Sequence, residues 1–430
     1  MTRAKAGEGS PMNHQEDFSL PTLLPESEVA QPVPDGGLVA WAQVLGAHLT
    51  VCNSWGYVSA FGVFQTYYAE LLAEPASDVS WIGSVQVFLL FFVGVFSGRA
   101  ADAGYFGLTW GAGAGLAVLG IFASSFGSQY WQLLLSQGLC MGVGCGLMFC
   151  PVVSLIPTYF SRHRCLAVGL AGAGSAVGGL VFPAIVSRLL PRIGFPWTMR
   201  VLGFMTLTTL LVSWMLMRQR TSPRRLGPVV EWAAFRDLPY ALFSVGMFLN
   251  FWGLYVAFFY ISSFAENAIG FNQQQAIDLL MIMNGAGFLP RIGPSYLADR
   301  CTGPMNLMIP SALLSGVLIL VWASVSDRQG LYVFVVLYGT FAASFQALFP
   351  ATLASICPDM KTIGTRIGMV MTVISFASLT GPPLAGVLLA MGDGSYLYIQ
   401  LFAGLTTMLG TGVLLVARVC KYGFAINLRA

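Results

Sequence analysis

Apolar residues occur along this chain in long, nearly continuous runs, each about as long as a membrane-spanning helix. A membrane β-barrel would instead alternate apolar and polar positions in segments of about ten residues. The runs therefore predict an all-α membrane protein with twelve transmembrane helices. We expect them over Leu38–Phe64, Ser80–Ser97, Leu108–Phe126, Trp131–Thr158, Cys165–Leu189, Pro196–Met217, Pro239–Phe264, Gln275–Leu297, Asn306–Ala323, Leu331–Ile356, Gly364–Met391 and Tyr396–Val419.

Polar stretches divide these runs into two groups of six. Residues 1–34 are polar and mildly acidic, lack the pattern of a cleaved signal peptide, and predict a disordered cytoplasmic tail, so the first helix is expected to direct membrane insertion. We expect one six-helix half over 35–217 and a second over 239–419. A cytoplasmic linker at 218–238 is expected to join them, and a cytoplasmic tail at 420–430 to end the chain.

Charged residues make up 9% of the chain, against about a quarter in soluble proteins, and hydrophobic residues make up 56%. With both termini in the cytoplasm, the outer loops carry only Arg188, Arg192 and Arg328. Most of the other Lys and Arg residues fall in the tails, the linker and the inner loops, so the distribution favours this orientation. We expect a multi-pass protein, of the plasma membrane or else of a vacuolar or other internal membrane.

The two groups of helices also repeat each other. Asp102 and Asp299 follow the second and eighth segments and lie 197 positions apart (299 − 102). Gly169 and Pro183 stand 14 apart in the fifth segment, and Gly368 and Pro382 repeat that spacing 199 positions later (368 − 169). Such offsets indicate a duplicated six-plus-six architecture, in which solute sites lie at mid-membrane between the halves.

Three motifs resemble those of a known family. PDGGLVAWAQVLGA at 34–47 is similar to the entry signature of the monocarboxylate porter family, within the major facilitator superfamily and especially its fungal branch. YFSRHRCLAVGLAGAGSAVGG, from residue 159, resembles the second signature of that family, a basic pair followed by a glycine ladder. The loops GRAADAGYFG and LADRCTG resemble the superfamily's Gly-x-x-x-Asp loop. The resemblance covers nearly everything after residue 33.

The resemblance implies gradient-driven transport of a small organic solute by alternating access, with no enzymatic activity. Proton-coupled animal relatives carry a lysine where this chain aligns Ser59, and an aspartate where it has Gly287. The missing proton carriers argue against simple proton–lactate symport. We therefore expect a fungal efflux carrier of an organic acid or secondary metabolite, with a monocarboxylate or riboflavin-like vitamin uptake porter as the alternative. A membrane sensor that no longer transports is a third, different class.

Arg291 is the main candidate for solute binding. A guanidinium in mid-helix is costly unless it faces a partner or a wet cavity. The residue lies about eight positions before Asp299, or about 12 Å along a helix, which is deep enough for a central cavity. There it could bind a carboxylate or phenolate, although a structural pair with a neighbouring helix would also explain it.

Uncharged polar and aromatic residues at mid-helix are further candidates, each also explicable as core: Asn53, Tyr57, Asn250, Trp252, Tyr255, Asn284, Phe345 and Gln346. The resemblance implies that the first, fourth, seventh and tenth helices line the path. Together with Arg291 these residues would suit a planar, weakly acidic solute.

Charged and glycine positions near the inner loops are expected to act in gating or packing: Asp102, Asp299, Arg99, Arg162, Arg164, Arg300, Gly169, Gly174 and Gly178. His48 and Asp278 could carry protons, but a packing role and a helix-end role, respectively, are the simpler interpretations. Arg200 is expected to reach the headgroups at the outer face.

The eight cysteines include no CxxC pair and no His at metal-ligand spacing, so we expect neither metal nor cofactor. GAGAG at 111–115 lies within an apolar run, without the preceding strand of a dinucleotide-binding fold. The expected partners are a small anionic or aromatic solute and the lipid bilayer, with no nucleic acid and no obligate protein partner.

Overall fold

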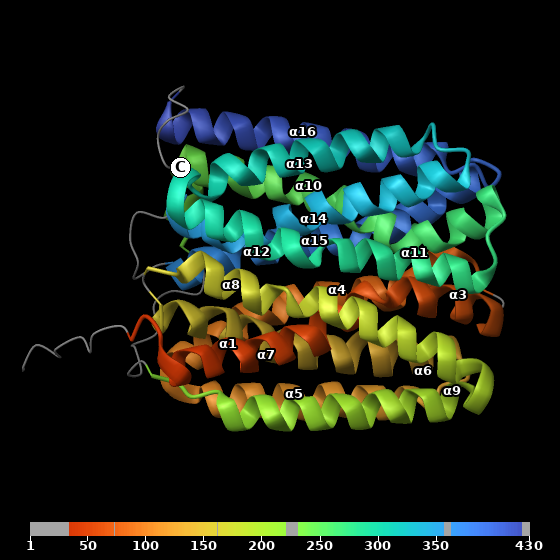
Figure 1. The fold of residues 1–430 in the computed structure, drawn as a ribbon, viewed down its shortest axis with the longest axis horizontal. Helices are drawn as coiled ribbons and strands as arrows, with labels where there is room; N and C mark the ends of the chain where they lie inside the picture. The colour runs from red at the N-terminus through yellow and green to blue at the C-terminus, as the bar shows by residue number, and fades with distance from the viewer. Residues whose placement is uncertain (1–33, 73, 161, 221–230, 357–362, 424–430) are drawn as a thin grey trace, which may run out of the picture. The chain divides into compact units, whose positions relative to one another are not determined.

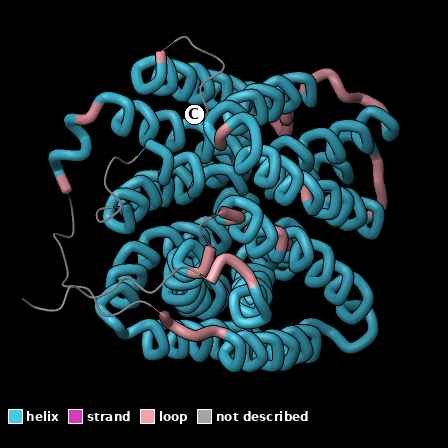
Figure 2. Tube along the Cα trace, turned by 60° about the vertical axis from the view of Figure 1, so that its left-hand side comes forward, coloured by secondary structure: helices cyan, strands magenta, loops and turns pink. Residues whose placement is uncertain are grey.

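A computed structural model describes the chain except for residues 1–33, 73, 161, 221–230, 357–362 and 424–430. The expected tail at 1–34 thus falls almost wholly outside the described residues, as do parts of the linker and of the C-terminal tail. The part of the chain described below, from Pro34 onward, forms one compact unit. Its regular structure is helical, with short connecting loops and no strand among the described residues (Figure 2).

The helices before the linker follow one another with several irregular turns. They are α1 (Gly37–Val51), η1 (Cys52–Gly56), α2 (Tyr57–Ser59), α3 (Phe61–Leu72), α4 (Ala76–Ala100), η2 (Ala101–Tyr105), α5 (Phe106–Ser124), α6 (Tyr130–Leu133), η3 (Leu134–Met141), α7 (Gly142–Leu155), η4 (Ile156–Thr158), α8 (Arg164–Gly172) and α9 (Gly174–Leu216). The long α9 is two helices joined at Gly194, whose positive φ of 73° marks the point where the chain turns back (Figure 1).

The remaining helices form the second group. They are η5 (Trp232–Arg236), α10 (Leu238–Phe264), η6 (Ala265–Ile269), α11 (Gln273–Ala286), α12 (Phe288–Leu297), η7 (Ala298–Thr302), α13 (Pro304–Trp322), α14 (Arg328–Ile356), α15 (Ile363–Met391) and α16 (Leu397–Tyr422). Figure 1 shows this group above the helices of the first group.

Within the described residues, nine helices are long and apolar enough to cross a membrane. One of them, Arg164–Leu216, contains both the fifth and the sixth expected segments. The first and eighth segments are not among the nine. The first is divided among α1, η1, α2 and α3, and the eighth breaks at Gly287 between α11 and α12. The all-helical membrane fold is confirmed, and the count of twelve stays a prediction.

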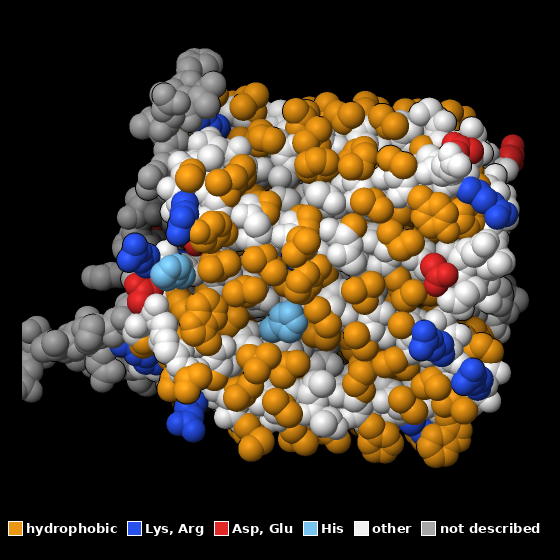
Figure 3. Space-filling model, viewed as in Figure 1, with side chains coloured by type: hydrophobic (Ala, Val, Ile, Leu, Met, Phe, Trp, Pro, Cys, Tyr) orange, Lys and Arg blue, Asp and Glu red, His pale blue; other side chains and the backbone are white. Residues whose placement is uncertain are grey.

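The surface of the bundle matches this assignment. On the face in Figure 3, apolar side chains cover the middle, whereas charged ones gather toward the two ends. Large apolar side chains such as Phe204, Leu211 and Leu405 are more than half exposed. Because water would penalise such a surface and hydrocarbon would not, the middle of the bundle is suited to lipid.

The two groups of helices are in contact toward both ends of the bundle. We call the end where α1 begins and α16 ends the terminal end, and the opposite one the far end (Figure 1). At the far end the two groups of helices are in close contact: the rings of Phe61 and Phe259 lie 5.0 Å apart, and a Cβ on Gly62 would lie 2.9 Å from the carbonyl oxygen of Phe258. The far end is therefore closed between the groups.

The sequence repeat has a structural counterpart. The loops that hold Asp102 and Asp299 both form one π-helical turn, η2 and η7, and each contains or precedes a glycine at positive φ, Gly104 and Gly303, 199 positions apart (303 − 104). Gly169 of α8 packs on Ser295 of α12. Its repeat mate Gly368 of α15 packs on Val95 of α4, so this pair of glycines makes corresponding contacts from each group to the other.

The linker is anchored to both groups. The backbone N–H of Arg218 donates to the side-chain oxygen of Gln43, and Gln219 donates to the carbonyl of Ala101, so the first linker residues belong to the first group. On the other side of residues 221–230, Glu231 forms an ion pair with Arg366 of α15 at 3.1 Å.

Candidate solute cavity between the two groups of helices

An inner cavity of about 80 Å³ lies in the middle of the bundle. Both groups of helices contribute to its wall, which consists of Val51, Trp55, Phe91, Phe149, Gly172, Ser175, Phe251, Arg291, Gln346, Ala347, Phe349, Pro350 and Met371. The wall is mostly aromatic and aliphatic, with one cation and a few neutral polar groups. Small-molecule sites commonly have this composition.

Arg291 is the charged residue of this wall. It is 4% exposed, and its Nη1 donates to the carbonyl oxygen of Gly287, 3.1 Å away and one turn earlier in the chain. In the described part of the chain this is the one hydrogen bond that the side chain makes, whereas a guanidinium carries five N–H donors. Most of its hydrogen-bonding capacity is thus left for an occupant of the cavity.

Gly287 explains how the guanidinium fits. A Cβ at this position would lie 2.6 Å from Nη1 of Arg291 and 2.8 Å from Cβ of Ala343. Any side chain at 287 would therefore touch the arginine. Because residue 287 is glycine, no side chain occupies the space beside Nη1. The chain therefore has no counterpart here of the aspartate that the family resemblance implies for proton-coupled animal relatives.

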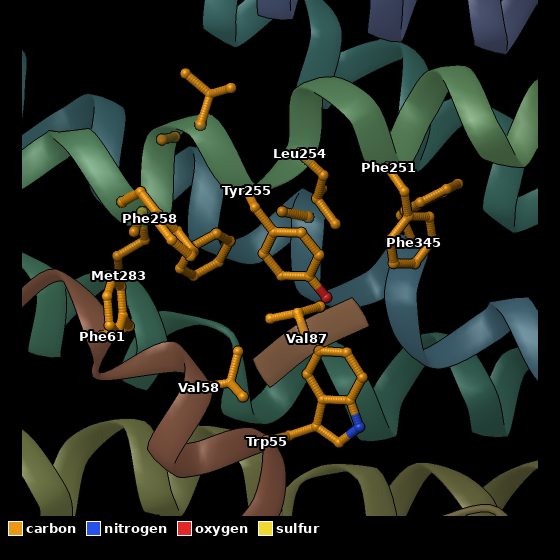
Figure 4. Close-up of a cluster of buried hydrophobic side chains, with 14 of the residues drawn as sticks. Trp55, Val58, Phe61, Val87, Phe251, Leu254, Tyr255, Phe258, Met283 and Phe345 are labelled. Carbon is orange, nitrogen blue, oxygen red and sulfur yellow. The ribbon is translucent and has the colours of Figure 1, made fainter. Parts of the chain in front are cut away.

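Aromatic rings from both groups flank the arginine. The Trp55 ring packs on Phe91 at 5.0 Å and on Phe149 at 5.5 Å, and it stacks on Tyr255 at 6.2 Å between ring centres. Figure 4 shows the Tyr255 hydroxyl pointing from α10 toward Val87 and the Trp55 ring.

Two buried polar atoms in this cluster lack partners within the described chain: the Tyr255 hydroxyl and Nε1 of Trp55. Unpaired buried donors cost about 1–3 kcal/mol each. They are therefore candidates for contacts with a bound solute.

The structure brings four of the predicted solute-binding residues together. Arg291 and Gln346 line the inner cavity, and Tyr255 stacks on its Trp55 wall. Phe345 lies behind that wall, with its ring 5.8 Å from Phe251 (Figure 4). The sequence reasoning missed Trp55, whose position in an apolar run gives no signal of which way the ring points.

The other predicted solute-binding residues lie in contacts between helices of the same group. Asn53 donates to Thr209 of α9 at 2.8 Å, and the buried ring of Tyr57 packs on Phe64 and Phe182. Asn250 accepts a hydrogen bond from Thr411 of α16, and Trp252 packs on Phe402 of the same helix. These four side chains are not part of the cavity wall.

Asn284 lies between the two groups instead. Its amide nitrogen donates to the carbonyl of Leu280, and its Oδ1 has no partner in the described chain. A Cβ on Gly179 of α9 would lie 2.6 Å from that oxygen, so the asparagine packs closely against α9. It does not belong to the cavity wall either.

A second, terminal cavity of about 140 Å³ lies between the terminal ends of α4, α7, α8, α14 and α15. Arg99 and Arg164 contribute to its wall, and the other residues are mostly apolar. Pro350 and Met371 line both cavities, so the two adjoin.

Asp299 caps α8. Its carboxylate accepts from the backbone N–H groups of Cys165 at 3.3 Å and Leu166 at 3.0 Å. An acidic group at a helix N-terminus is stabilised by the free N–H groups and by the helix dipole. The loop of one group thus holds the first turn of a helix in the other. The side chain of Asp102 lies outside the described residues.

The other predicted gating and coupling residues are dispersed. The backbone N–H of Arg162 donates to Asp35, Arg300 covers the Tyr296 ring at 4.7 Å, and Nδ1 of His48 lies 2.8 Å from the carbonyl oxygen of Leu170. At the far end, Asp278 accepts from Gln274, and Arg200 lies over Trp197 at 4.8 Å.

Gly174 and Gly178 begin α9 where it crosses the first segment: Gly174 faces the His48 carbonyl, and Gly178 faces that of Cys52. No cluster of His, Cys, Asp or Glu suited to a metal ion occurs among the residues that the structure describes.

Comparison with known proteins identifies relatives along the whole bundle. The family model of the Major Facilitator Superfamily matches residues 47–294. The chain is 43% identical over 389 residues to an MFS-type transporter of Gibberella zeae, covering 90% of this chain and 88% of the relative. It is 39% identical to the MFS-type transporter dbaD of Emericella nidulans, over 89% of this chain and 87% of the relative.

The name of a third relative states what it transports. The aspyridones efflux protein apdF of Emericella nidulans is 35% identical over 403 residues, which cover 93% of this chain and 81% of that protein. The helical membrane bundle, the cavity between its two groups of helices and these similarities along the chain agree. This protein is a transporter of the Major Facilitator Superfamily.

Proposed function

We propose that the protein exports a small, planar, weakly acidic organic molecule, a fungal secondary metabolite, by alternating access. The observation that carries this proposal is the buried guanidinium of Arg291 in a cavity walled by aromatic rings. A carboxylate or phenolate would supply the acceptors for its N–H groups, and a flat ring would fit between Trp55 and Phe349. The relative named for aspyridone efflux supports the direction and the class of cargo.

The motifs from residues 34 and 159 support placing the chain in the monocarboxylate porter branch. The Lys and Arg distribution supports cytoplasmic termini, so the terminal end of the bundle would face the cytoplasm. An exporter of a secreted metabolite belongs in the plasma membrane.

With the terminal end facing the cytoplasm, the structure corresponds to one step of the transport cycle. The far end is closed by contacts such as Phe61 on Phe259, whereas both cavities lie between the groups away from it. On the terminal side the groups are joined as well, by Gly169 on Ser295 and Gly368 on Val95. The structure then corresponds to a form closed between the groups at both ends, which would open at the terminal end to accept solute from the cytoplasm. Rocking of the groups about the inner cavity would release the solute at the far end.

The test is transport by the purified protein in proteoliposomes, with radiolabelled aromatic carboxylates such as 1-naphthoate at neutral pH. Arg291→Gln removes the cation but keeps a polar side chain of moderate size. We expect the flux of the acids to fall at least about tenfold, which corresponds to about 1.4 kcal/mol and to less than one charge-assisted hydrogen bond. Arg200→Gln is the matched control, because Arg200 lies at the far end over Trp197.

Both variants must elute as monodisperse protein, so that the comparison concerns recognition rather than folding. Wild-type flux of the acids through Arg291→Gln, or an equal loss in Arg200→Gln, would overturn the assignment of the solute site.

A further inference from the structure

The terminal cavity combines an apolar wall with two arginines from different helices. Its walls are largely apolar side chains such as Val153, Ile367 and Met371, and Arg99 and Arg164 also line it. Arg99 lies in the last turn of α4, and Arg164 is the first residue of α8. An apolar chamber with cations from two helices suits an amphipathic anion, which can place its acidic group on the arginines and its hydrocarbon part in the chamber.

The position of the terminal cavity indicates the path that a solute would take. Its wall contains Val153 of α7 from the first group and Ala354 of α14 from the second, so an occupant would separate the groups at the terminal end. It adjoins the inner cavity through Pro350 and Met371. A molecule that leaves it inward therefore meets the wall that contains Arg291.

We propose that the terminal cavity is a separate loading site, where the acidic group of an amphipathic organic anion docks at Arg99 and Arg164 before the molecule moves to Arg291. The proposal rests on the proposed function, since it concerns the same class of cargo. The two arginines raise the local concentration of anions and the rate of entry, an effect that salt screens. Arg291 holds the solute during the conformational change.

The experiment places a thiol in the wall with Ala354→Cys and follows its modification in detergent by mass spectrometry of the peptide that contains it. Two methanethiosulfonate reagents of similar size are compared, one with a sulfonate and one with a quaternary ammonium group. We expect the ratio of anionic to cationic labelling rates to fall at least threefold when Arg99→Gln and Arg164→Gln are added. The matched control, Arg162→Gln with Arg300→Gln, removes the same charge from the same end of the bundle and leaves the cavity wall intact.

Occupancy of the terminal cavity by a ligand is measured as protection of the Ala354→Cys thiol from labelling. 1-Naphthoate should slow labelling at least threefold in the Ala354→Cys protein and in its Arg291→Gln derivative, and should lose this effect in the Arg99→Gln, Arg164→Gln derivative. Raising the salt concentration from 20 to 500 mM in the Ala354→Cys protein alone should lower the anion preference, which tests the charges without removing a side chain.

Protection that disappears with Arg291→Gln, or that survives the loss of Arg99 and Arg164, would place the ligand elsewhere and overturn the loading site. Equal labelling ratios in all variants, or no protection in any of them, would do the same. The outcome does not depend on the transport assay. If Arg291→Gln leaves transport unchanged, the proposed function fails even where the labelling pattern is as expected.

Discussion

Asparagine residues at similar membrane depth differ in what their amides do. Asn53 binds Thr209 and Asn250 binds Thr411, each within its own group of helices, and Asn284 packs on Gly179. Residue type and depth could be predicted from the sequence, but the face of the helix could not, because these segments are apolar all round. The buried cation of Arg291 gave the clearer signal, since a charge at that depth requires a wet cavity or a partner.

The glycines of the fifth segment also differ from one another in their contacts. A Cβ on Gly178 would lie 2.6 Å from Cα of Gly56 and closer still to the Cys52 carbonyl oxygen, whereas one on Gly172 meets nothing within 4 Å. Spacing alone made these glycines look equivalent. The structure shows that Gly178 permits contact between backbones and that Gly172 borders the inner cavity.

We therefore predict that Gly178→Ala destabilises the protein by about 1–3 kcal/mol, because backbone atoms cannot yield as a flexible side chain would. Gly172→Ala should be neutral or slightly stabilising, since alanine favours the helix. The measurement is the thermal unfolding midpoint of both variants in detergent. Equal midpoints for the two variants would show that the close contact with Gly56 does not limit stability.

At the scale of elements, the sequence predicted most segments to within a few residues but treated each as continuous. The first segment is instead divided into α1, η1, α2 and α3, and the eighth breaks at Gly287. A hydropathy window averages over such breaks, since they need no polar residue. Both interrupted segments carry residues of the inner cavity wall, Trp55 and Arg291, which the irregular backbone helps to position.

Asp299 couples two elements, because the loop η7 holds the first turn of α8. Asp299→Ala should weaken that turn by about 0.5–2 kcal/mol, so that the amides of Cys165 and Leu166 exchange with solvent about 2- to 30-fold faster. Hydrogen exchange read by mass spectrometry would measure this. Asp278→Ala is the control, since that carboxylate accepts from Gln274 at the far end. Faster exchange of this turn in both variants alike, or in neither, would contradict the capping role.

At the scale of the whole molecule, the repeat in the sequence predicted a duplicated six-plus-six architecture with solute sites between the halves. Offsets of 197 and 199 positions relate loops with the same π-helical turn, and they relate the contact of Gly169 with Ser295 to that of Gly368 with Val95. The terminal cavity could not be predicted, because its wall comes from five helices distant in sequence. It depends on how closely the groups approach, which no local pattern encodes.

Transport by alternating access requires the two groups to move against each other, and a reversible cross-link between them tests this requirement. A Cβ on Gly368 of α15 would lie 3.6 Å from Cβ of Val95 of α4, within the spacing of a disulfide. The control is Gly94→Cys, one residue away, which can pair with the native Cys150 of the same group, whose Cβ would lie 3.3 Å away.

The measurement is the flux of 1-naphthoate into proteoliposomes after oxidation and again after reduction, with the disulfides mapped by mass spectrometry. We expect that the Val95→Cys, Gly368→Cys protein stops transporting when oxidised and regains transport when reduced, while the Gly94→Cys protein transports in both states. Continued transport by the cross-linked double variant would contradict this requirement.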